Sequence, residues 1–407
     1  MQVSLETITQ AAALIHGAVM RTPCLPAPKL SLLTGADIFV KYENLQVTNA
    51  FKERGALVKL SSLADSERER GVIAMSAGNH AQAVAYHAAR LGIPATIVMP
   101  EPTPFVKVAA TRGYGARVVL AGEVLADAQA EAERIANEEN LVWVHPYDDA
   151  AIISGQGTIA LEMLEDQPDL DCLVVPVGGG GLISGMAVAA KARKHGIEVI
   201  GVEAALYPSM IGALRGEAVT CGGATLAEGI AVKNVGRLTL EIVRETVDDI
   251  LLVDEATLER AVNAYLTRQK TMAEGAGAAG LAALLAYPER FAGKRVGLVL
   301  CGGNIDPRLL SSIMVRELAR EGRLLSIRIT TADRPGILGE ISTLIGRLGG
   351  NILEVSHHRL FLNVPAKGTT LDVTMETHDP DHAGRILSAL EQAGHSVRTL
   401  DLGESRI

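Results

Sequence analysis

Four consecutive glycines, Gly178 to Gly181, constrain the fold of this 407-residue chain more than any other feature. They follow the apolar run 172–177, which is typical of a buried strand, and precede a helical pattern over 182–195. Backbone N–H groups at such a strand-to-helix turn can bind an anion. The spacing is neither G-x-G-x-x-G nor a Walker loop. The run therefore predicts a compact phosphate site, with an ordinary turn, which needs only one or two glycines, as the alternative.

The same alternation of strand and helix patterns recurs through residues 1–322. Strand patterns separated by helical ones predict right-handed βαβ units on parallel sheets. Besides 172–177, the strand patterns lie at 71–75, 95–100, 115–120, 198–202 and 297–300. The fold class is therefore α/β, with two open parallel-sheet subdomains, of which residues of about 48–148 form the smaller.

Composition restricts the function classes. The formal net charge of −9 argues against a nucleic-acid partner, which needs a basic face. The four cysteines contain no CxxC pair, which favours a reducing compartment and gives no zinc signature. No signal peptide and no apolar run of about 20 residues is found, so we expect no membrane partner and a cytoplasmic location.

Lys52, directly after Phe51, is a candidate for covalent catalysis. An amine acts as a nucleophile or base only when it is deprotonated, which burial and nearby positive charge favour. Because Glu53 and Arg54 follow it, a solvated helix face is the alternative.

Two further segments end predicted strands with polar groups. Ser76-Ala77-Gly78-Asn79-His80 precedes a helical pattern over 81–91, so its N–H groups and side chains could hold a carboxylate. His80 is a candidate base there, with a structural histidine as the alternative. Cys301-Gly302-Gly303-Asn304 follows the strand pattern 297–300, at the sheet end where ligands bind. Cys301 could be a nucleophile, a hydrogen-bond partner or a buried apolar residue.

In this order, these segments resemble the fold-type II pyridoxal 5′-phosphate (PLP) enzymes, in the group of threonine dehydratase (threonine ammonia-lyase), serine dehydratase and serine racemase. The resemblance covers residues of about 5–320. The matching segments are 43–46, 51–56, 76–82, 178–182 and 302–304.

The resemblance implies a role for each segment. Lys52 would bind PLP covalently and then serve as the base that removes the Cα proton, while Phe51 flanks the cofactor. Asn79 would bond the phenolic oxygen of PLP, and Cys301 would meet the pyridine nitrogen. A neutral partner there favours elimination over transamination. The remaining implied residues bind the phosphate (Gly178, Gly179, Gly180, Gly181 and Leu182) or the substrate carboxylate (Ser76, Ala77, Gly78 and His80).

The implied reaction is β-elimination of L-threonine to 2-oxobutanoate and ammonia, with L-serine to pyruvate as a secondary activity. A 3-hydroxyaspartate or serine ammonia-lyase of the same fold is the alternative, and a non-enzymatic amino-acid sensor is a third hypothesis. Racemisation is disfavoured, because Ala77 stands where racemases of this family have a serine. Glu203 and Glu228 fall where some relatives bind a cation, but no metal ligands are assigned.

Residues 325–407 differ from the rest and predict a separate domain. Their β-α-β-β-α-β order is ferredoxin-like, with strand patterns that include 352–359. The segment around Asp333, Gly336, Ile337 and Leu338 resembles the turn of an ACT domain that binds an amino-acid effector. Such domains pair across subunits, so the resemblance implies a homodimer or homotetramer, allosteric regulation and a link to isoleucine biosynthesis. A dimerisation module without a ligand is the alternative.

Overall fold

The computed structural model describes residues 2–358 and 368–400. The chain divides into two compact units, Met1–Ile305 and Asp306–Ile407. Helix α15 (Pro307–Arg320), which the sequence grouped with the first domain, falls in the second unit, where it contacts strand β11 (Leu324–Ala332). The predicted strand end at Arg359 and residues 401–407 lie outside the described residues. No helix in the described ranges is long and apolar enough to cross a membrane.

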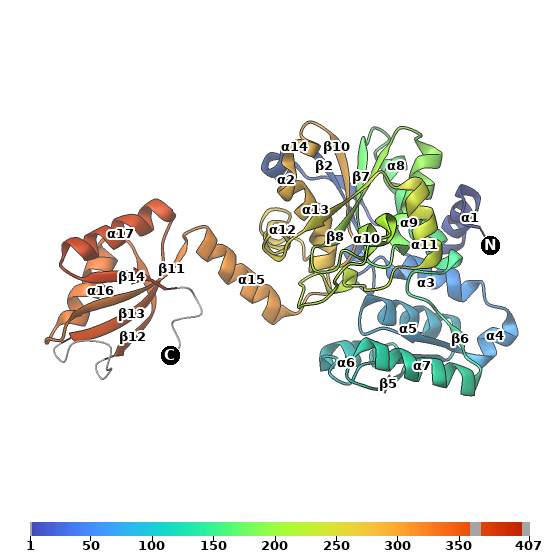
Figure 1. The fold of residues 1–407 in the computed structure, drawn as a ribbon, viewed down its shortest axis with the longest axis horizontal. Helices are drawn as coiled ribbons and strands as arrows, with labels where there is room; N and C mark the ends of the chain where they lie inside the picture. The colour runs from blue at the N-terminus through green and yellow to red at the C-terminus, as the bar shows by residue number, and fades with distance from the viewer. Residues whose placement is uncertain (1, 359–367, 401–407) are drawn as a thin grey trace. The chain divides into compact units, whose positions relative to one another are not determined.

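A six-stranded sheet forms the centre of the first unit (Figure 1). Its order is β1 (Cys24–Pro26), β2 (Asp37–Tyr42), β10 (Arg295–Leu300), β7 (Cys172–Pro176), β8 (Glu198–Ala204) and β9 (Asp249–Val253). All neighbours are parallel except the edge strand β1. Helices α8 (Ala150–Asp166) and α9 (Gly181–Arg193) cover one face, and α12 (Glu255–Arg268) and α13 (Gly275–Ala286) cover the other. This confirms the predicted parallel α/β architecture.

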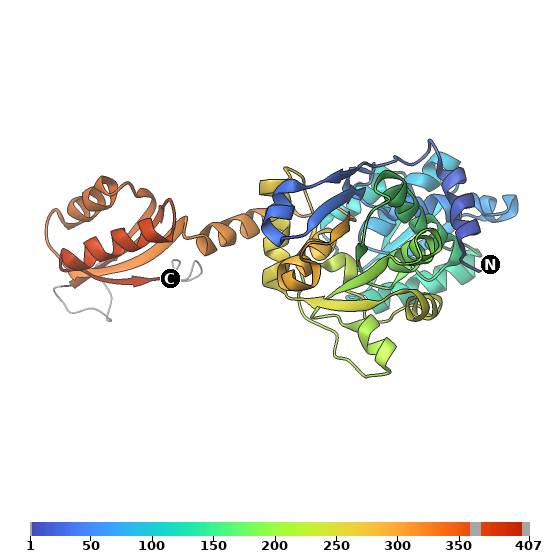
Figure 2. The ribbon, with the colours of Figure 1, turned by 90° about the horizontal axis from the view of Figure 1, so that it is seen from above.

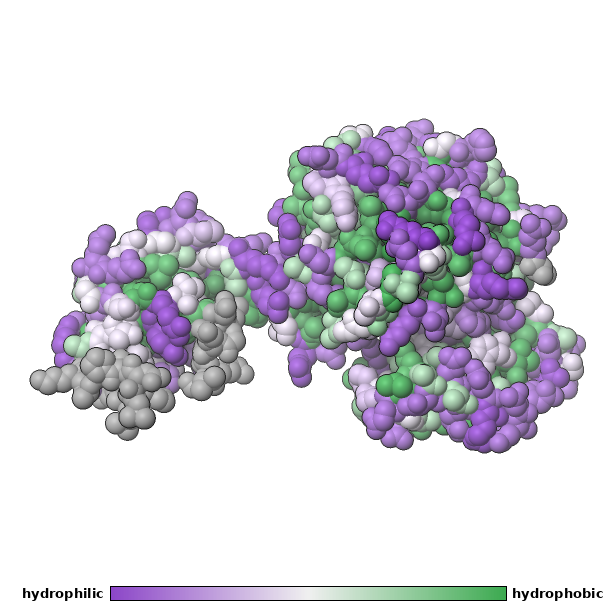
Figure 3. Space-filling model, in the orientation of Figure 1, coloured by the Kyte–Doolittle hydropathy of each residue, from purple (hydrophilic) through white to green (hydrophobic). Residues whose placement is uncertain are grey.

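A second, four-stranded parallel sheet forms the smaller part of this unit. Its order is β5 (Arg117–Leu120), β4 (Ala95–Met99), β3 (Val72–Met75) and β6 (Val142–Trp143). It is flanked by α5 (Asn79–Leu91), α6 (Phe105–Gly113) and α7 (Leu125–Glu139). The outer side of α7 is rich in charged residues, which gives this part a largely hydrophilic surface in Figure 3.

The other elements of the first unit are shorter connections or peripheral helices. They are α1 (Leu5–Ile15), α2 (Pro28–Thr34), η1 (Glu43–Leu45), α3 (Lys52–Ser61), α4 (Asp65–Arg70), α10 (Ser209–Arg215), η2 (Glu228–Ile230), α11 (Arg237–Thr246) and α14 (Pro288–Phe291).

Glycines allow α3, α8 and α9 to approach one another closely. A Cβ on Gly155 of α8 would lie 2.6 Å from the Cα of Gly55 in α3. A Cβ on Gly185 of α9 would lie 2.2 Å from the carbonyl oxygen of Ile153. Because backbone atoms fill these positions, the glycines fix where α3, and so its first residue Lys52, sits against the large sheet.

Replacing Gly155 by alanine is expected to destabilise the protein by about 1–3 kcal/mol, because overpacking forces two helix backbones apart. The midpoint of urea unfolding measures this. The control is Gly113→Ala at the end of α6, where a Cβ meets nothing within 4 Å. That change should be neutral or slightly stabilising, since alanine favours helix over glycine. Equal loss in both variants would contradict the close-packing argument.

The second unit is a four-stranded antiparallel sheet in the order β12 (Asn351–His358), β13 (Gly368–Glu376), β11 and β14 (Ser396–Thr399). Helices α16 (Ile337–Arg347) and α17 (Pro380–Gln392) lie together on one face of it (Figure 2). Apolar side chains such as Ile327, Ile341, Leu371 and Ile386 form the core between sheet and helices. The predicted ferredoxin-like β-α-β-β-α-β plan is confirmed.

Candidate active site

Lys52 begins α3 and points into the interior of the first unit. Its Nζ donates to the carbonyl oxygen of Pro146 at 2.8 Å and lies 5.1 Å from the centroid of the Phe51 ring. The N–H of Phe51 donates to the carbonyl oxygen of Cys301 at 3.0 Å, which ties the start of α3 to the end of β10. Desolvation of the amine lowers the pKa of Lys52 to about 8, although the nearby Cys301 and Glu274 oppose the shift. A solvated surface lysine does not have these surroundings.

Asn79, the first residue of α5, is held by partners on both sides of its amide. Its Nδ2 donates to Oε1 of Glu274 at 2.7 Å, and its Oδ1 accepts from Nδ2 of Asn304 at 2.8 Å. Asn304 is itself oriented, since its Nδ2 also donates to the carbonyl of Thr48 and its Oδ1 accepts from Asn49. An amide nitrogen has two N–H donors, so one N–H of Asn79 remains for an acceptor placed in the site.

Glu274, at the start of α13, belongs to the site although no sequence motif marks it. Its backbone N–H donates to the carbonyl of Gly302, and a Cβ on Gly302 would lie 2.2 Å from its Oε1. Burial raises the pKa of Glu274 to about 7, against the hydrogen bond from Asn79. The only sequence signal is its setting among small residues, Ala273-Glu274-Gly275-Ala276, which is typical of close backbone approach.

The four glycines form a nest of backbone N–H groups at the start of α9, packed closely against neighbouring residues. Gly180 has φ 94°, a left-handed conformation that glycine adopts without strain. Within the described residues, no acceptor is found for the N–H groups of Gly178 to Gly181. Thr239 Oγ1 donates to the carbonyl of Gly179 at 2.7 Å, and the ring of Tyr147 lies against Gly179. Because Tyr147 follows Pro146, which accepts from Lys52, the nest and the lysine are neighbours.

The loop 76–80 presents backbone rather than side chains. Ser76 Oγ accepts from the N–H of Gly78 at 3.2 Å, and Ala77 offers only a methyl group. The ring of His80 is buried and bonds the carbonyl of Val144 through Nε2 at 2.9 Å. Burial lowers the pKa of His80 to about 3, so the ring is neutral. This favours the structural histidine over the candidate base. Its backbone N–H, in the first turn of α5, has no intrahelical acceptor and can still serve a carboxylate.

Comparison with known proteins identifies this arrangement. The family model described as pyridoxal-phosphate dependent enzyme matches residues 15–302, which include every residue of this site except Asn304. The chain belongs to the pyridoxal-phosphate dependent enzyme family. The ACT domain model matches residues 325–404.

Relatives of this PLP enzyme extend over both units. An L-threonine ammonia-lyase of Thermotoga maritima is 44% identical over 398 residues, covering 97% of this chain and 99% of the relative. Among solved structures, maize serine racemase is 34% identical with a TM-score of 0.73, covering 79% of this chain and 100% of that one. Threonine deaminase isoform 2 of Solanum lycopersicum is 33% identical with a TM-score of 0.73, covering 79% and 91%.

The residues of the site fit PLP. The nest offers unpaired N–H groups to a phosphate, with Leu182 buried in the first turn behind it. Lys52 is placed next to the nest, and Asn79 keeps one N–H for the phenolic oxygen. Cys301 is buried, and desolvation and the neighbouring Glu274 raise the pKa of its thiol. The thiol is therefore neutral, as a partner for an unprotonated ring nitrogen requires, and is a poor nucleophile.

The acidic residues considered for a cation have other partners. Glu203 accepts the N–H groups of Met210 and Ile211 at 2.7 and 3.0 Å, at the start of α10. Glu228 pairs with Lys107 at 2.6 Å. Over residues 2–358 and 368–400, no group of three or more His, Cys, Asp or Glu side chains is placed to hold a metal ion.

The rate at which PLP attaches to the apo-protein is expected to rise with pH, with a midpoint near 8. Only the neutral amine of Lys52 attacks an aldehyde, and its pKa lies at about 8 instead of 10.5. Below the midpoint the rate should fall about tenfold per pH unit. Because ionised Glu274 raises the pKa of Lys52, Glu274→Gln should move the midpoint lower. A midpoint near 10 would instead indicate a solvated lysine.

Proposed function

We propose that this chain is an L-threonine ammonia-lyase. It eliminates water across Cα and Cβ of L-threonine, and hydrolysis of the resulting enamine gives 2-oxobutanoate and ammonia. L-serine gives pyruvate as a secondary activity. The supporting observation is the 44% identity to an L-threonine ammonia-lyase over 97% of this chain, which includes both the PLP site and the ACT domain.

The site residues have separate tasks in this reaction. PLP, when bound, withdraws electrons from Cα and so makes its proton acidic. Lys52 takes that proton on Nζ, and its lowered pKa of about 8 keeps a fraction of the amine neutral at physiological pH. The N–H groups that begin α5 hold the substrate carboxylate. Neutral Cys301 leaves the ring nitrogen unprotonated.

Ala77 favours elimination over racemisation. Racemisation needs an acid that delivers a proton to the face of Cα opposite the base. A methyl group cannot donate a proton, so we take the likeness to maize serine racemase as one of fold. We expect racemisation to be a minor side reaction at most.

Comparing kcat/KM for L-threonine, L-serine and threo-3-hydroxyaspartate tests the proposal. Formation of 2-oxo acid is measured with purified, PLP-loaded protein. L-threonine should rank first. If 3-hydroxyaspartate or L-serine exceeds it by orders of magnitude, the alternative ammonia-lyase replaces this proposal. No 2-oxo acid from any of the three would favour the non-enzymatic sensor.

For the second unit we propose amino-acid binding at the start of α16. Gly336 precedes this helix with φ 86°, Ile337 is buried, and Leu338 is exposed. Asp333 lies in the turn between β11 and α16. The N–H groups of the first helical turn are suited to an effector carboxylate. Isoleucine and other branched amino acids are the first candidates, which connects the chain to isoleucine biosynthesis. Titrating each into the full-length enzyme and following the L-threonine saturation curve tests this.

We also propose a homodimer or homotetramer in the cytoplasm. The ACT match supports pairing between subunits. All four cysteines are free thiols, which supports a reducing compartment. Light scattering of the full-length protein gives the subunit number, and a monomer at micromolar concentration would contradict the assembly.

A further inference from the structure

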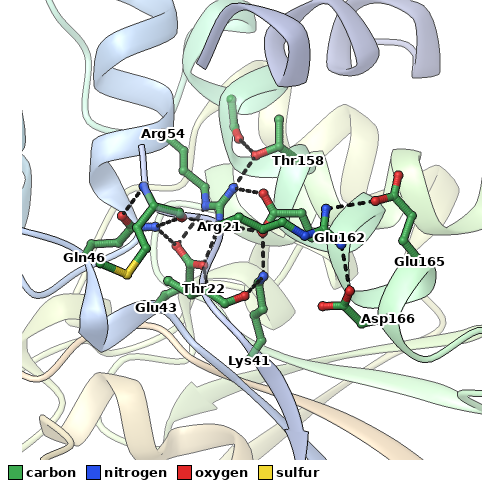
Figure 4. Close-up of polar contacts among 12 residues, drawn as sticks. Arg21, Thr22, Lys41, Glu43, Gln46, Arg54, Thr158, Glu162, Glu165 and Asp166 are labelled. Carbon is green, nitrogen blue, oxygen red and sulfur yellow. Dashed lines mark hydrogen bonds and ion pairs between the residues drawn. The ribbon is translucent and has the colours of Figure 1, made fainter. Parts of the chain in front are cut away.

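A buried ionic cluster lies against the first turn of α3, the helix that Lys52 begins, and its polar contacts are drawn in Figure 4. We define the Arg54 cluster as Lys41 of β2, Glu43 of η1, Arg54 of α3 and Glu162 of α8. Arg54 donates from Nε and NH2 to the two oxygens of Glu43, both at 2.8 Å. It also donates from NH1 and NH2 to the two oxygens of Glu162, at 2.7 and 2.8 Å. One guanidinium thus binds two carboxylates, each through both oxygens.

The cluster satisfies its hydrogen bonds and balances its charge. The fifth N–H of Arg54 donates to Thr158 Oγ1 at 3.1 Å, so all five donors of the guanidinium have partners. Lys41 Nζ donates to Glu162 at 2.5 Å and adds the second positive charge against the two carboxylates. Arg54, Lys41 and Glu43 are at most 1% exposed at their side chains. The attraction is therefore little screened by solvent or salt.

Stability alone does not account for such a cluster. Replacing a buried ion pair by apolar side chains of similar volume often leaves the stability of the fold unchanged or raises it, because the cost of desolvating the charges cancels most of their attraction. An apolar contact can slide, whereas paired bidentate bonds to a planar guanidinium define position and angle. The cluster is suited to fixing the start of α3 in one orientation.

Lys52 and Arg54 are the first and third residues of α3. Residues two apart in a helix point to nearly opposite sides, so Arg54 holds the first turn from behind while Lys52 faces the site. Two further bonds fix the same turn. The N–H of Phe51 donates to the carbonyl of Cys301, and Glu53 accepts from the N–H of Thr48 at 2.5 Å.

We propose that Arg54 is a positioning residue for the reaction: by binding Glu43 and Glu162 together, it sets the direction in which Lys52 presents its amine to PLP and to Cα. The claim rests on PLP chemistry at Lys52. Only its kinetic part rests on L-threonine as the substrate.

Arg54→Lys tests the proposal, because lysine keeps the charge but cannot bind two carboxylates through a planar fork. The matched control is Lys59→Met. Lys59 also links α3 to the start of α8, through Asp149 at 2.7 Å, but lies two turns beyond Lys52. The rate of PLP attachment to each apo-protein is followed by the absorbance of the Lys52 linkage. The kcat and KM for L-threonine are measured on the loaded proteins.

Arg54→Lys should slow PLP attachment and lower kcat by about 10- to 100-fold with KM changed less than about threefold, since a misplacement of the order of 1 Å can cost about 10² in rate. Lys59→Met should change both rates less than about twofold. If Arg54→Lys does not fold, Glu162→Gln replaces it, with the same direction expected and a loss of about three- to tenfold.

Normal attachment and kcat in a folded cluster variant would overturn the positioning role. So would equal losses in the cluster variant and in Lys59→Met, which would indicate a general loss of stability. Arg54→Lys could slow PLP attachment while the wild-type enzyme prefers a substrate other than L-threonine. That result would retain the positioning role and overturn only the proposed substrate.

Discussion

Replacing Lys52 by alanine is expected to lower kcat for L-threonine by about 10³-fold or more. The variant loses the base that removes the Cα proton, and general base catalysis alone contributes about 10²–10⁴. It also loses the amine that binds PLP covalently. Steady-state kinetics of 2-oxobutanoate formation measures the first loss. Borohydride reduction followed by mass spectrometry measures the second, because wild-type protein should gain one reduced cofactor and Lys52→Ala none.

Lys59→Ala is the control for that experiment. It removes a lysine from the same helix, and its pair with Asp149 is partly solvated, so we expect a stability change of about 1 kcal/mol at most. Cofactor attachment and kcat should remain within about twofold of wild type. A cofactor adduct on Lys52→Ala of the same yield as wild type would place the covalent linkage on another lysine.

The sequence predicted the parts of the site that sit at junctions between strands and helices. Lys52, Asn79 and Gly181 each begin a helix in the structure, and Cys301 directly follows a strand. The nest and Cys301 follow β7 and β10, which are adjacent parallel strands of one sheet, so they meet whatever their separation in the chain. Asn79 follows β3 of the other sheet and is joined to them through its hydrogen bonds with Glu274 and Asn304. The glycine turn also has a local signal, because left-handed backbone at Gly180 needs glycine.

Residues that act through distant partners carried no such signal. Glu274 is one acidic residue in a run of small ones, and its significance appears only when Asn79 lies 2.7 Å from it. Arg54 and Glu162 are 108 residues apart, and each alone is typical of a charged helix surface. Helix α13 was not predicted because it is buried almost throughout, so Gly, Ala and Leu occupy all its sides and no polar face gives a helical period.

Replacing Gly180 by alanine is expected to weaken PLP binding by about 10²-fold. A Cβ there would lie 2.6 Å from Met210 Cε and 2.8 Å from Thr239 Cβ, on a backbone with φ 94°. Left-handed backbone costs a residue with a Cβ about 1–2 kcal/mol. In the apo-protein of this variant the glycine loop can relax out of the left-handed conformation. PLP binding must then either restore that strained conformation or lose a hydrogen bond to the phosphate, and such a bond to a charged group contributes about 1.5–3 kcal/mol. Spectrophotometric titration of the apo-protein with PLP measures the dissociation constant.

Pyridoxal, which lacks the phosphate, separates loss of phosphate recognition from general damage. In Gly180→Ala the affinity for PLP should fall, while the affinity for pyridoxal should stay within about threefold of wild type. The ratio of PLP affinity to pyridoxal affinity should therefore decrease. Gly196→Ala is the control, because Gly196 follows the same helix α9 and a Cβ there meets nothing within 4 Å. Its ratio should equal that of wild type. A Gly180→Ala protein that keeps the wild-type ratio would mean that the phosphate binds outside the glycine nest, since the strained loop could not bind it at full strength.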